Sequence, residues 1–240
     1  MRTDPRRQAG QRQAILDAAA ASIAAHGFHG MSMRELAAAA GKGLSSLYHY
    51  FPSKEEILFA LQREAFETLI AATSEALAGV EGAPARLYAF ISQHVSYFAR
   101  HPELMRVLVH EAGSLPEEKR RILRRLKERY FGIGRGIVED LVAEGCARSG
   151  AGGADSMPEE AEMDRIAYSL FGMLNWVYGW YEPERHGSPI QLTRTIHRLA
   201  LCGLRTRCPF RAVEERVDSL LQALEAPPAV ADAAAAGGSW

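Results

Sequence analysis

Apolar residues recur every three or four positions along most of the 240-residue chain, and no stretch alternates apolar and polar residues convincingly. This spacing puts apolar side chains on one face of an α-helix, whereas a half-buried strand needs a period of two. The pattern predicts an all-α protein of about nine to ten helices. The expected ranges are 8–25, 33–39, 44–50, 53–78, 84–99, 102–112, 116–146, 158–181, 189–206 and 209–224.

A serine followed three residues later by Glu or Gln opens five of these apolar runs. The serine side chain can accept a hydrogen bond from a free N–H of the first turn, while the acid or amide reaches back to the serine. The repeated pattern indicates many helix starts. The five pairs are Ser32–Glu35, Ser53–Glu56, Ser114–Glu117, Ser156–Glu159 and Ser188–Gln191.

Two short helices joined by a glycine are predicted between residues 32 and 51. Gly41 ends the first helix, because glycine takes the left-handed conformation at low cost. In the second helix, Leu44, Leu47, Tyr48 and Phe51 form an apolar stripe. The opposite face carries Ser45, Ser46 and His49. Such a pair is typical of a helix-turn-helix, whose second helix enters the DNA major groove, although a hairpin that only packs has the same spacing.

The charge distribution favours DNA binding. The whole chain carries 28 Lys and Arg against 29 Asp and Glu, but residues 1–54 hold seven basic and three acidic residues. A net charge of +4 at one end suits a surface that neutralises phosphates.

The first 60 residues resemble the N-terminal domain of TetR-family transcriptional regulators. The resemblance rests on AILDAAAASIAAHGF (14–28), SMRELAAAAGKG (32–43) and SSLYHYFPSKEEIL (45–58). It implies a DNA-binding helix-turn-helix domain over 1–54, with three helices and a basic arm. It also implies a larger helical effector-binding and dimerisation domain over 55–226. The low-complexity composition of residues 227–240 predicts a disordered tail. The implied function is a ligand-responsive repressor that a small molecule releases from its double-stranded DNA operator.

Positions carried over from the family give the expected DNA contacts. Gly43 and Leu44 depart from the family pattern, because many relatives have Ser or Thr at the first position and a polar or basic residue at the second. The N-terminal arm either reaches DNA through Arg2, Arg6 and Arg7 or remains solvated. The residues expected to contact DNA are Ser32, Arg34, Lys42, Gly43, Ser45, Ser46, Tyr48, His49, Tyr50 and Lys54.

A homodimer is also implied, with the last two long helices pairing across a two-fold axis. Residues 166–181 are apolar nearly all round, which predicts burial on more than one side. The helix over 189–206 offers a narrow apolar seam, which could equally be ordinary core. The residues expected at the interface are Leu174, Tyr178, Leu192, Ile196, Leu199 and Gly203.

Small-molecule sites are mostly apolar and aromatic, with a few polar anchors. The segment MLNWVYGWYEPE (173–184) resembles a TetR-family branch associated with acyl-CoA sensing. The basic run from Lys119 to Arg129 could meet the phosphates of such a thioester, or it could be a solvated helix face. The candidate ligand-binding residues are Phe90, Tyr97, Met105, Leu108, Arg124, Phe131, Phe171, Asn175 and Trp176.

Other function classes fit the sequence poorly. Three cysteines, Cys146, Cys202 and Cys208, give neither a disulfide framework nor a zinc site, and no catalytic motif is present. We expect no metal, no cofactor and no membrane segment in a cytoplasmic regulator whose effector is an acyl-CoA. A lipophilic drug, an aromatic compound or a protein partner is the alternative signal.

Overall fold

The computed structural model describes residues 5–111, 113–149 and 159–204. These residues form ten α-helices and one 3-10 turn, with no strand among them, which confirms the all-α prediction. The helices are α1 Pro5–Gly30, α2 Met33–Ala39, α3 Leu44–Tyr50, α4 Lys54–Leu77, α5 Ala83–Arg100, α6 Pro102–His110, α7 Glu117–Ser149, α8 Glu160–Asn175, α9 Pro183–His186 and α10 Pro189–Leu204, and the 3-10 turn η1 is Val177–Gly179.

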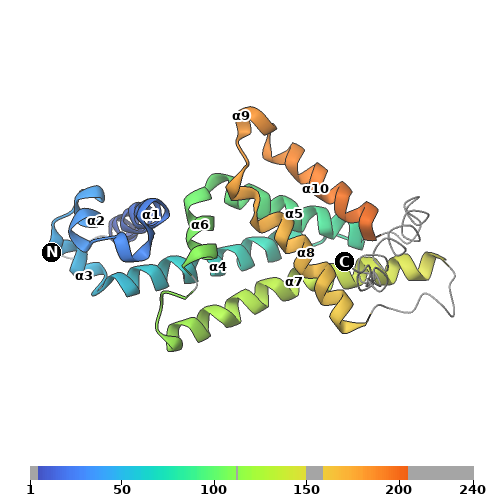
Figure 1. Cartoon of the computed structure of the whole chain (residues 1–240), viewed down its shortest axis with the longest axis horizontal. Coiled ribbons are helices and arrows are strands. Elements are labelled where there is room, and N and C mark those ends of the chain that lie inside the picture. Colours follow the sequence, from blue (N-terminus) through green and yellow to red (C-terminus); the bar gives the residue numbers. More distant parts are fainter. Residues whose placement is uncertain (1–4, 112, 150–158, 205–240) are drawn as a thin grey trace, which may run out of the picture.

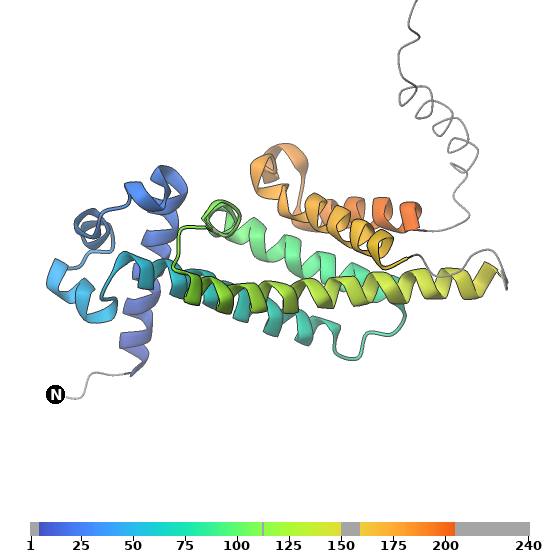
Figure 2. The ribbon, with the colours of Figure 1, turned by 60° about the horizontal axis from the view of Figure 1, so that its bottom comes forward.

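The molecule is elongated, with α1, α2 and α3 gathered at one end (Figure 1). The long helix α4 runs from this end into a bundle with α5 and α7, and α8 and α10 lie along one side of that bundle (Figure 2). We call α1–α3 with the first turns of α4 the N-terminal unit, and the rest the C-terminal bundle.

Two apolar cores share α4. The core of the N-terminal unit includes Ile57, Leu58 and Leu61 of α4, and it extends to Leu123 of α7. The bundle core begins at Ala65. The domain boundary expected at residue 54 therefore marks only the start of α4, because the cores divide inside a continuous helix.

Local signals placed several helix starts correctly. Ser32 and Ser53 each accept a hydrogen bond from the N–H three residues later, and Ser188 does the same for Gln191. The Ser114 prediction is wrong, because α7 begins only at Glu117, directly after Pro116, and the Ser114 hydroxyl donates instead to the Glu111 carboxylate at 2.5 Å. The Ser156 pair lies outside the described residues.

The helix predicted over 158–181 is shorter than expected. It ends at Asn175, and η1 follows before Pro183 opens the four-residue helix α9. Gly179 weakens the helix, and Pro183 cannot continue it. The helix predicted over 209–224 and the tail over 227–240 lie outside the described residues.

No helix in the described part of the chain is long and apolar enough to span a membrane. The same residues contain no group of three or more His, Cys, Asp or Glu side chains placed to hold a metal ion.

Candidate nucleic-acid interface and small-molecule cavity

A tight turn brings the seven-residue helices α2 and α3 together. Ser32 Oγ accepts a hydrogen bond from the Glu35 N–H at 3.2 Å and donates to the Glu35 carboxylate at 2.7 Å. Gly41 has φ +63°, the left-handed conformation that ends a helix. Gly43 precedes α3 with extended backbone and no side chain to cap it. This geometry is that of a helix-turn-helix.

The outer face of α3 is open to a partner. Ser45, Ser46 and His49 are exposed, whereas Leu47 is completely buried. The predicted apolar stripe is narrower than expected, because Leu44 is 42% exposed and Tyr48 is 47% exposed. A two-turn helix touches its core along few positions, and its remaining side chains lie on the exposed surface.

Two of the residues expected to contact DNA, Tyr50 and Lys54, form hydrogen bonds within the chain. The Tyr50 hydroxyl donates to Gln11 Oε1 at 2.6 Å and ties α3 to α1. The Lys54 ammonium approaches the Phe28 and His29 carbonyls at 3.4 and 3.5 Å. An ammonium has three donors, so Lys54 keeps one for an outside acceptor. The Tyr50 hydroxyl uses its proton on Gln11, so in this arrangement it can only accept a hydrogen bond from outside, and its contact with DNA stays a prediction.

The cations around α3 are Arg34, which is exposed, and Lys42, which is half-buried. Neither forms an ion pair with any residue that the structure describes. Arg12 differs, because its guanidinium forms a two-fold contact with the Glu64 carboxylate that raises the pKa of Arg12. In the basic arm, Arg6 and Arg7 are exposed, and Arg2 is outside the described residues.

A cavity of about 430 Å³ opens among α4, α5, α6, α7 and α8. Its volume is in the range of small-molecule sites, and its walls are mainly aromatic and aliphatic. His94, Lys127, Glu128 and Asn175 are its polar or charged lining residues. The apolar and aromatic lining residues are Phe66, Leu69, Phe98, Met105, Leu108, Val109, Tyr130, Phe131, Tyr168 and Phe171.

The structure brings five of the nine predicted ligand residues to this cavity, namely Met105, Leu108, Phe131, Phe171 and Asn175. Phe90 instead lies completely buried behind the Tyr130 and Phe171 rings.

The other three predicted ligand residues lie elsewhere. Tyr97 lines a different cavity, and the Arg124 side chain is 60% exposed and paired with Glu117. Trp176 is 62% exposed. Helical periodicity alone does not distinguish a cavity wall from the core behind it or from the outer surface.

A buried polar pair at the cavity was missed by sequence reasoning. The His94 Nδ1 and Tyr130 hydroxyl are 2.9 Å apart, and no described residue is within hydrogen-bonding geometry of His94 Nε2. Burial lowers the pKa of His94 to about 3, against a smaller opposing effect of the Leu174 backbone, so the ring is neutral. His94 shares a helix face with Phe90 and Phe98 at intervals of four residues, and this spacing was the available signal.

The basic run on α7 does not act as one group. Lys119 pairs with Glu56, and Arg120 pairs with Glu117. Lys127 alone reaches the cavity; its ammonium lies 5.7 Å from the Phe66 ring centroid, and burial lowers its pKa. Of the two alternatives for this run, contact with a ligand phosphate is therefore open only to Lys127, because no other cation of the run lines the cavity.

The predicted dimer residues are also divided. Leu174, Leu192 and Ile196 are buried in the protomer's own core, so the prediction that they face a partner is corrected. Tyr178 is half-buried, with its hydroxyl 2.8 Å from His110 Nε2, and Gly203 lies in α10. The exposed apolar side chains of this side of the bundle include Met173, Trp176, Ile190 and Leu199.

Helix α6 joins the bundle to the N-terminal unit at an interruption in α1. Gly27 has φ +72° and ψ 164°, which breaks the helical hydrogen bond expected between the Ala24 carbonyl and the Phe28 N–H. Two α6-side residues replace that bond. Arg106 donates to the Ala24 carbonyl at 3.4 Å, and the Phe28 N–H donates to the Glu111 carboxylate at 2.9 Å.

Comparisons with known proteins agree with this architecture. Residues 15–61 match a family described as bacterial regulatory proteins, tetR family, and residues 81–204 match the tetracyclin repressor-like C-terminal domain. The fatty acid metabolism regulator protein of Bacillus subtilis (strain 168) is 29% identical over 194 residues, covering 80% of this chain and 95% of the relative.

Solved structures show the same fold. A TetR-family transcriptional regulator from Bordetella parapertussis 12822 aligns with a TM-score of 0.69 and 25% identity, over 79% of this chain and 93% of that one. The transcriptional regulator FadR from Bacillus subtilis, solved in complex with stearoyl-CoA, aligns with a TM-score of 0.60 and 25% identity, over 79% and 97%. One family model covers the helix-turn-helix, and the other covers the bundle over more than half of the chain. The chain therefore belongs to the TetR family of DNA-binding transcriptional regulators, which are not enzymes.

Proposed function

We propose that this regulator is a repressor that binds its operator as a homodimer and is released by an acyl-CoA, in which an apolar acyl chain is joined to a charged CoA group. The cavity among α4–α8 carries the proposal, because it combines a ligand-sized volume with aromatic and aliphatic walls. An acyl chain would bury its apolar surface against Phe66, Phe131 and Phe171. A CoA phosphate group would be attracted to the ammonium of Lys127.

The relatives support this class of effector. The Bacillus subtilis relative is named a fatty acid metabolism regulator, and the FadR structure contains stearoyl-CoA. The two alignments cover 80% and 79% of this chain.

Helix α6 provides the route from effector to DNA. It contributes Met105 and Leu108 to the cavity wall, and the same helix contributes Arg106 to the interrupted α1, with Glu111 directly after it. A ligand that displaces α6 would therefore move α1 and with it α3. Release requires the ligand to bind the DNA-incompetent arrangement more tightly than the DNA-competent one.

Dimerisation would set the spacing of two α3 helices at about one DNA turn. The exposed Met173, Trp176 and Leu199 give the α8 and α10 side of the bundle an apolar surface that a second copy would cover. Sedimentation velocity should report a dimer, and Leu199→Glu should shift it toward monomer. A wild-type monomer at micromolar concentration would contradict this part of the proposal.

The test of the proposed function is fluorescence anisotropy of the full chain on the DNA upstream of its own gene, at two salt concentrations. Stearoyl-CoA, free CoA and stearate are added in turn. Release by stearoyl-CoA but not by either fragment supports an acyl-CoA effector. Release by stearate alone supports a lipophilic effector instead, and DNA binding unchanged by all three compounds supports a different effector or a protein partner.

A matched pair of variants isolates the role of the cavity charge. Lys127→Gln removes the ammonium at the cavity, whereas Arg125→Gln removes an exposed charge two residues away. We expect Lys127→Gln alone to lower the affinity for stearoyl-CoA about tenfold. The affinity of this variant should also depend less on salt concentration than that of the wild type. Equal losses for both variants would indicate a general charge effect.

A further inference from the structure

Gly134 lies one turn of α7 beyond Tyr130, which is a wall residue of the cavity among α4–α8, here called the effector cavity. Gly134 is buried, and a methyl group in its place would lie 2.8 Å from Phe171 Cε2 and 2.9 Å from Phe90 Cζ. Carbon atoms that are not bonded to each other prefer a separation of roughly 3.5–4.0 Å. A side chain at this position would therefore have to move at least one ring by roughly 0.7 Å.

Two other glycines of α7 have no such neighbours. A methyl group at Gly132 or at Gly136 would meet open space, with nothing within 4 Å. Glycine weakens the interior of a helix relative to alanine, and at these two positions an alanine would fit without displacing a neighbour. Gly134 differs from them, because its missing side chain lets the rings of Phe90 on α5 and Phe171 on α8 lie directly against α7.

The Phe171 ring has more room to move than the Phe90 ring. Phe90 is completely buried and packs against the Tyr130 ring, and the Tyr130 hydroxyl is 2.9 Å from His94 Nδ1. Phe171 instead lines the effector cavity, so part of its ring faces open volume. A side chain at position 134 would therefore push the Phe171 ring into the cavity and reduce the volume left for a ligand.

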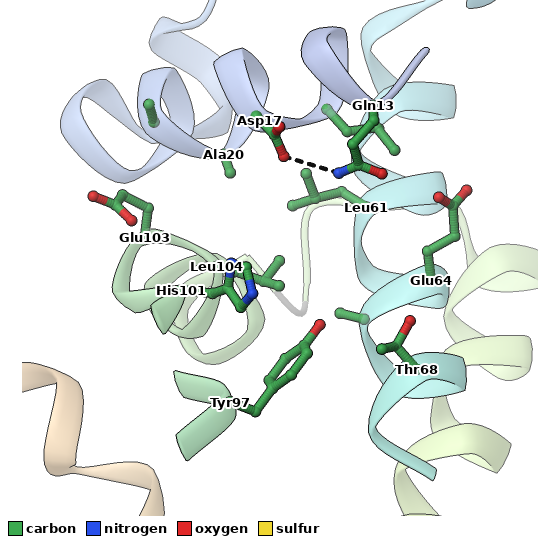
Figure 3. Close-up of a pocket in the computed structure, with 13 residues that line it drawn as sticks. Gln13, Asp17, Ala20, Leu61, Glu64, Thr68, Tyr97, His101, Glu103 and Leu104 are labelled. Carbon is green, nitrogen blue, oxygen red and sulfur yellow. Dashed lines mark hydrogen bonds between the residues drawn. The ribbon is translucent and has the colours of Figure 1, made fainter. Parts of the chain in front are cut away.

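A second cavity, of about 390 Å³, lies where α1, α4 and α6 meet, and it suits an alkyl chain less well. Burying polar groups against an alkyl chain would remove them from water without giving them hydrogen-bond partners. Figure 3 shows such side chains on the walls of this second cavity, among them Gln13, Asp17, Glu64, Thr68 and Glu103. The part of the effector that varies in length is therefore assigned to the effector cavity beside Phe171.

We propose that Gly134 sets the length of the apolar chain that this regulator accepts. The inference rests on the proposed function, because it places the alkyl part of the effector in the effector cavity. Gly134 acts through Phe171: the bare backbone lets the ring lie back against α7, and this leaves volume for the last methylenes of a long chain. A regulator with alanine at this position would select shorter chains.

Calorimetric titration of the full chain with octanoyl-, dodecanoyl- and stearoyl-CoA tests the proposal in the wild type, Gly134→Ala and the control Gly136→Ala. Excluding one methylene from an apolar site lowers the affinity about fourfold. We expect Gly134→Ala to lower the ratio of stearoyl-CoA affinity to octanoyl-CoA affinity by at least this factor. Gly136→Ala should keep the wild-type ratio. Equal ratios in all three proteins would overturn the proposal.

A double variant tests the direction in which the ring moves. Phe171→Leu shortens the displaced side chain, so its combination with Gly134→Ala should restore the wild-type ratio of affinities. Circular dichroism and thermal melts confirm the folding of each variant. A ratio that stays low in the double variant would mean that the added methyl group separates the helices instead, which would overturn the role assigned to Phe171.

A series of 1-alkanols from hexanol to dodecanol separates this inference from the proposed function, because the alcohols carry an alkyl chain without the CoA group. Gly134→Ala should lose affinity for the longer alcohols relative to the shorter ones, and Gly136→Ala should not. A wild type that binds the alcohols but no acyl-CoA would contradict the proposed function alone. A wild type that binds neither series would overturn both.

Discussion

The N-terminal unit and the C-terminal bundle differ in how completely their buried polar side chains are hydrogen-bonded. In the described residues up to 54, no buried side-chain nitrogen or oxygen lacks a partner, and serine caps and the Tyr50–Gln11 bond hold the short helices in place. In the described residues from α4 onward, six buried side-chain atoms lack one, among them Gln62 Oε1, His94 Nε2 and the Thr193 hydroxyl. The buried polar atoms without a partner therefore all lie outside the helix-turn-helix, and His94 is the one among them that lines the cavity of about 430 Å³.

The largest expected effect is a difference in stability loss between a residue of a filled core and a residue of a cavity wall. Leu47→Ala removes a completely buried side chain and should cost about 2–5 kcal/mol of unfolding free energy, with loss of DNA binding. Leu108→Ala should cost less, because one side of Leu108 already faces the cavity. Urea unfolding followed by circular dichroism measures both. Equal losses would remove the distinction between the two regions.

Buried His94 predicts a pH dependence in the bundle. The unfolded chain binds a proton on this ring near pH 6.5, but the folded protein does so only near pH 3. Stability should therefore fall as the pH drops below 6.5, by about 1.4 kcal/mol per pH unit. Urea midpoints of His94→Gln should lack this slope, whereas those of His26→Gln, at an exposed position, should keep it. A slope unchanged in His94→Gln would exclude this residue as its source.

The link between the regions can be cut at Glu111. Glu111→Ala leaves the Phe28 N–H without its acceptor and should cost about 1–2 kcal/mol. Glu111→Gln retains an amide oxygen that can accept the same bond. We expect the alanine variant to bind effector normally but to release DNA less completely in anisotropy titrations. Full release by the alanine variant would show that coupling follows another route.

The smallest expected effect concerns the uncapped start of α3. Gly43→Ser supplies a side chain that can accept a hydrogen bond from the first turn, and it should stabilise the protein by a few tenths of a kcal/mol. A thermal melt measures the gain. Ser32→Ala removes an existing cap and should lower the melting temperature. A lower melting temperature for Gly43→Ser as well would show that the missing cap does not limit the stability of α3.

Short-range patterns predicted the N-terminal unit well. The Ser32 cap, the Gly41 turn and the burial of Leu47 depend on neighbours within a few residues, which a sequence displays directly. The bundle was harder to predict. Whether Phe90, Phe131 or Trp176 faces a cavity, a core or solvent depends on how several helices meet. The partners of Lys54 and Glu111 are 26 and 83 residues away, beyond any local pattern.

The interruption at Gly27 has a consequence for protein engineering. TetR-family DNA-binding segments invite transplantation from one regulator to another, and residue 54 would be the obvious junction for a chimera. In this chain the transplanted segment would carry an open carbonyl at Ala24 and an open amide at Phe28, and the groups that close them would stay behind at Arg106 and Glu111. A working hybrid would therefore have to transfer a second piece of sequence, residues 106–111, that is far from the first in the gene.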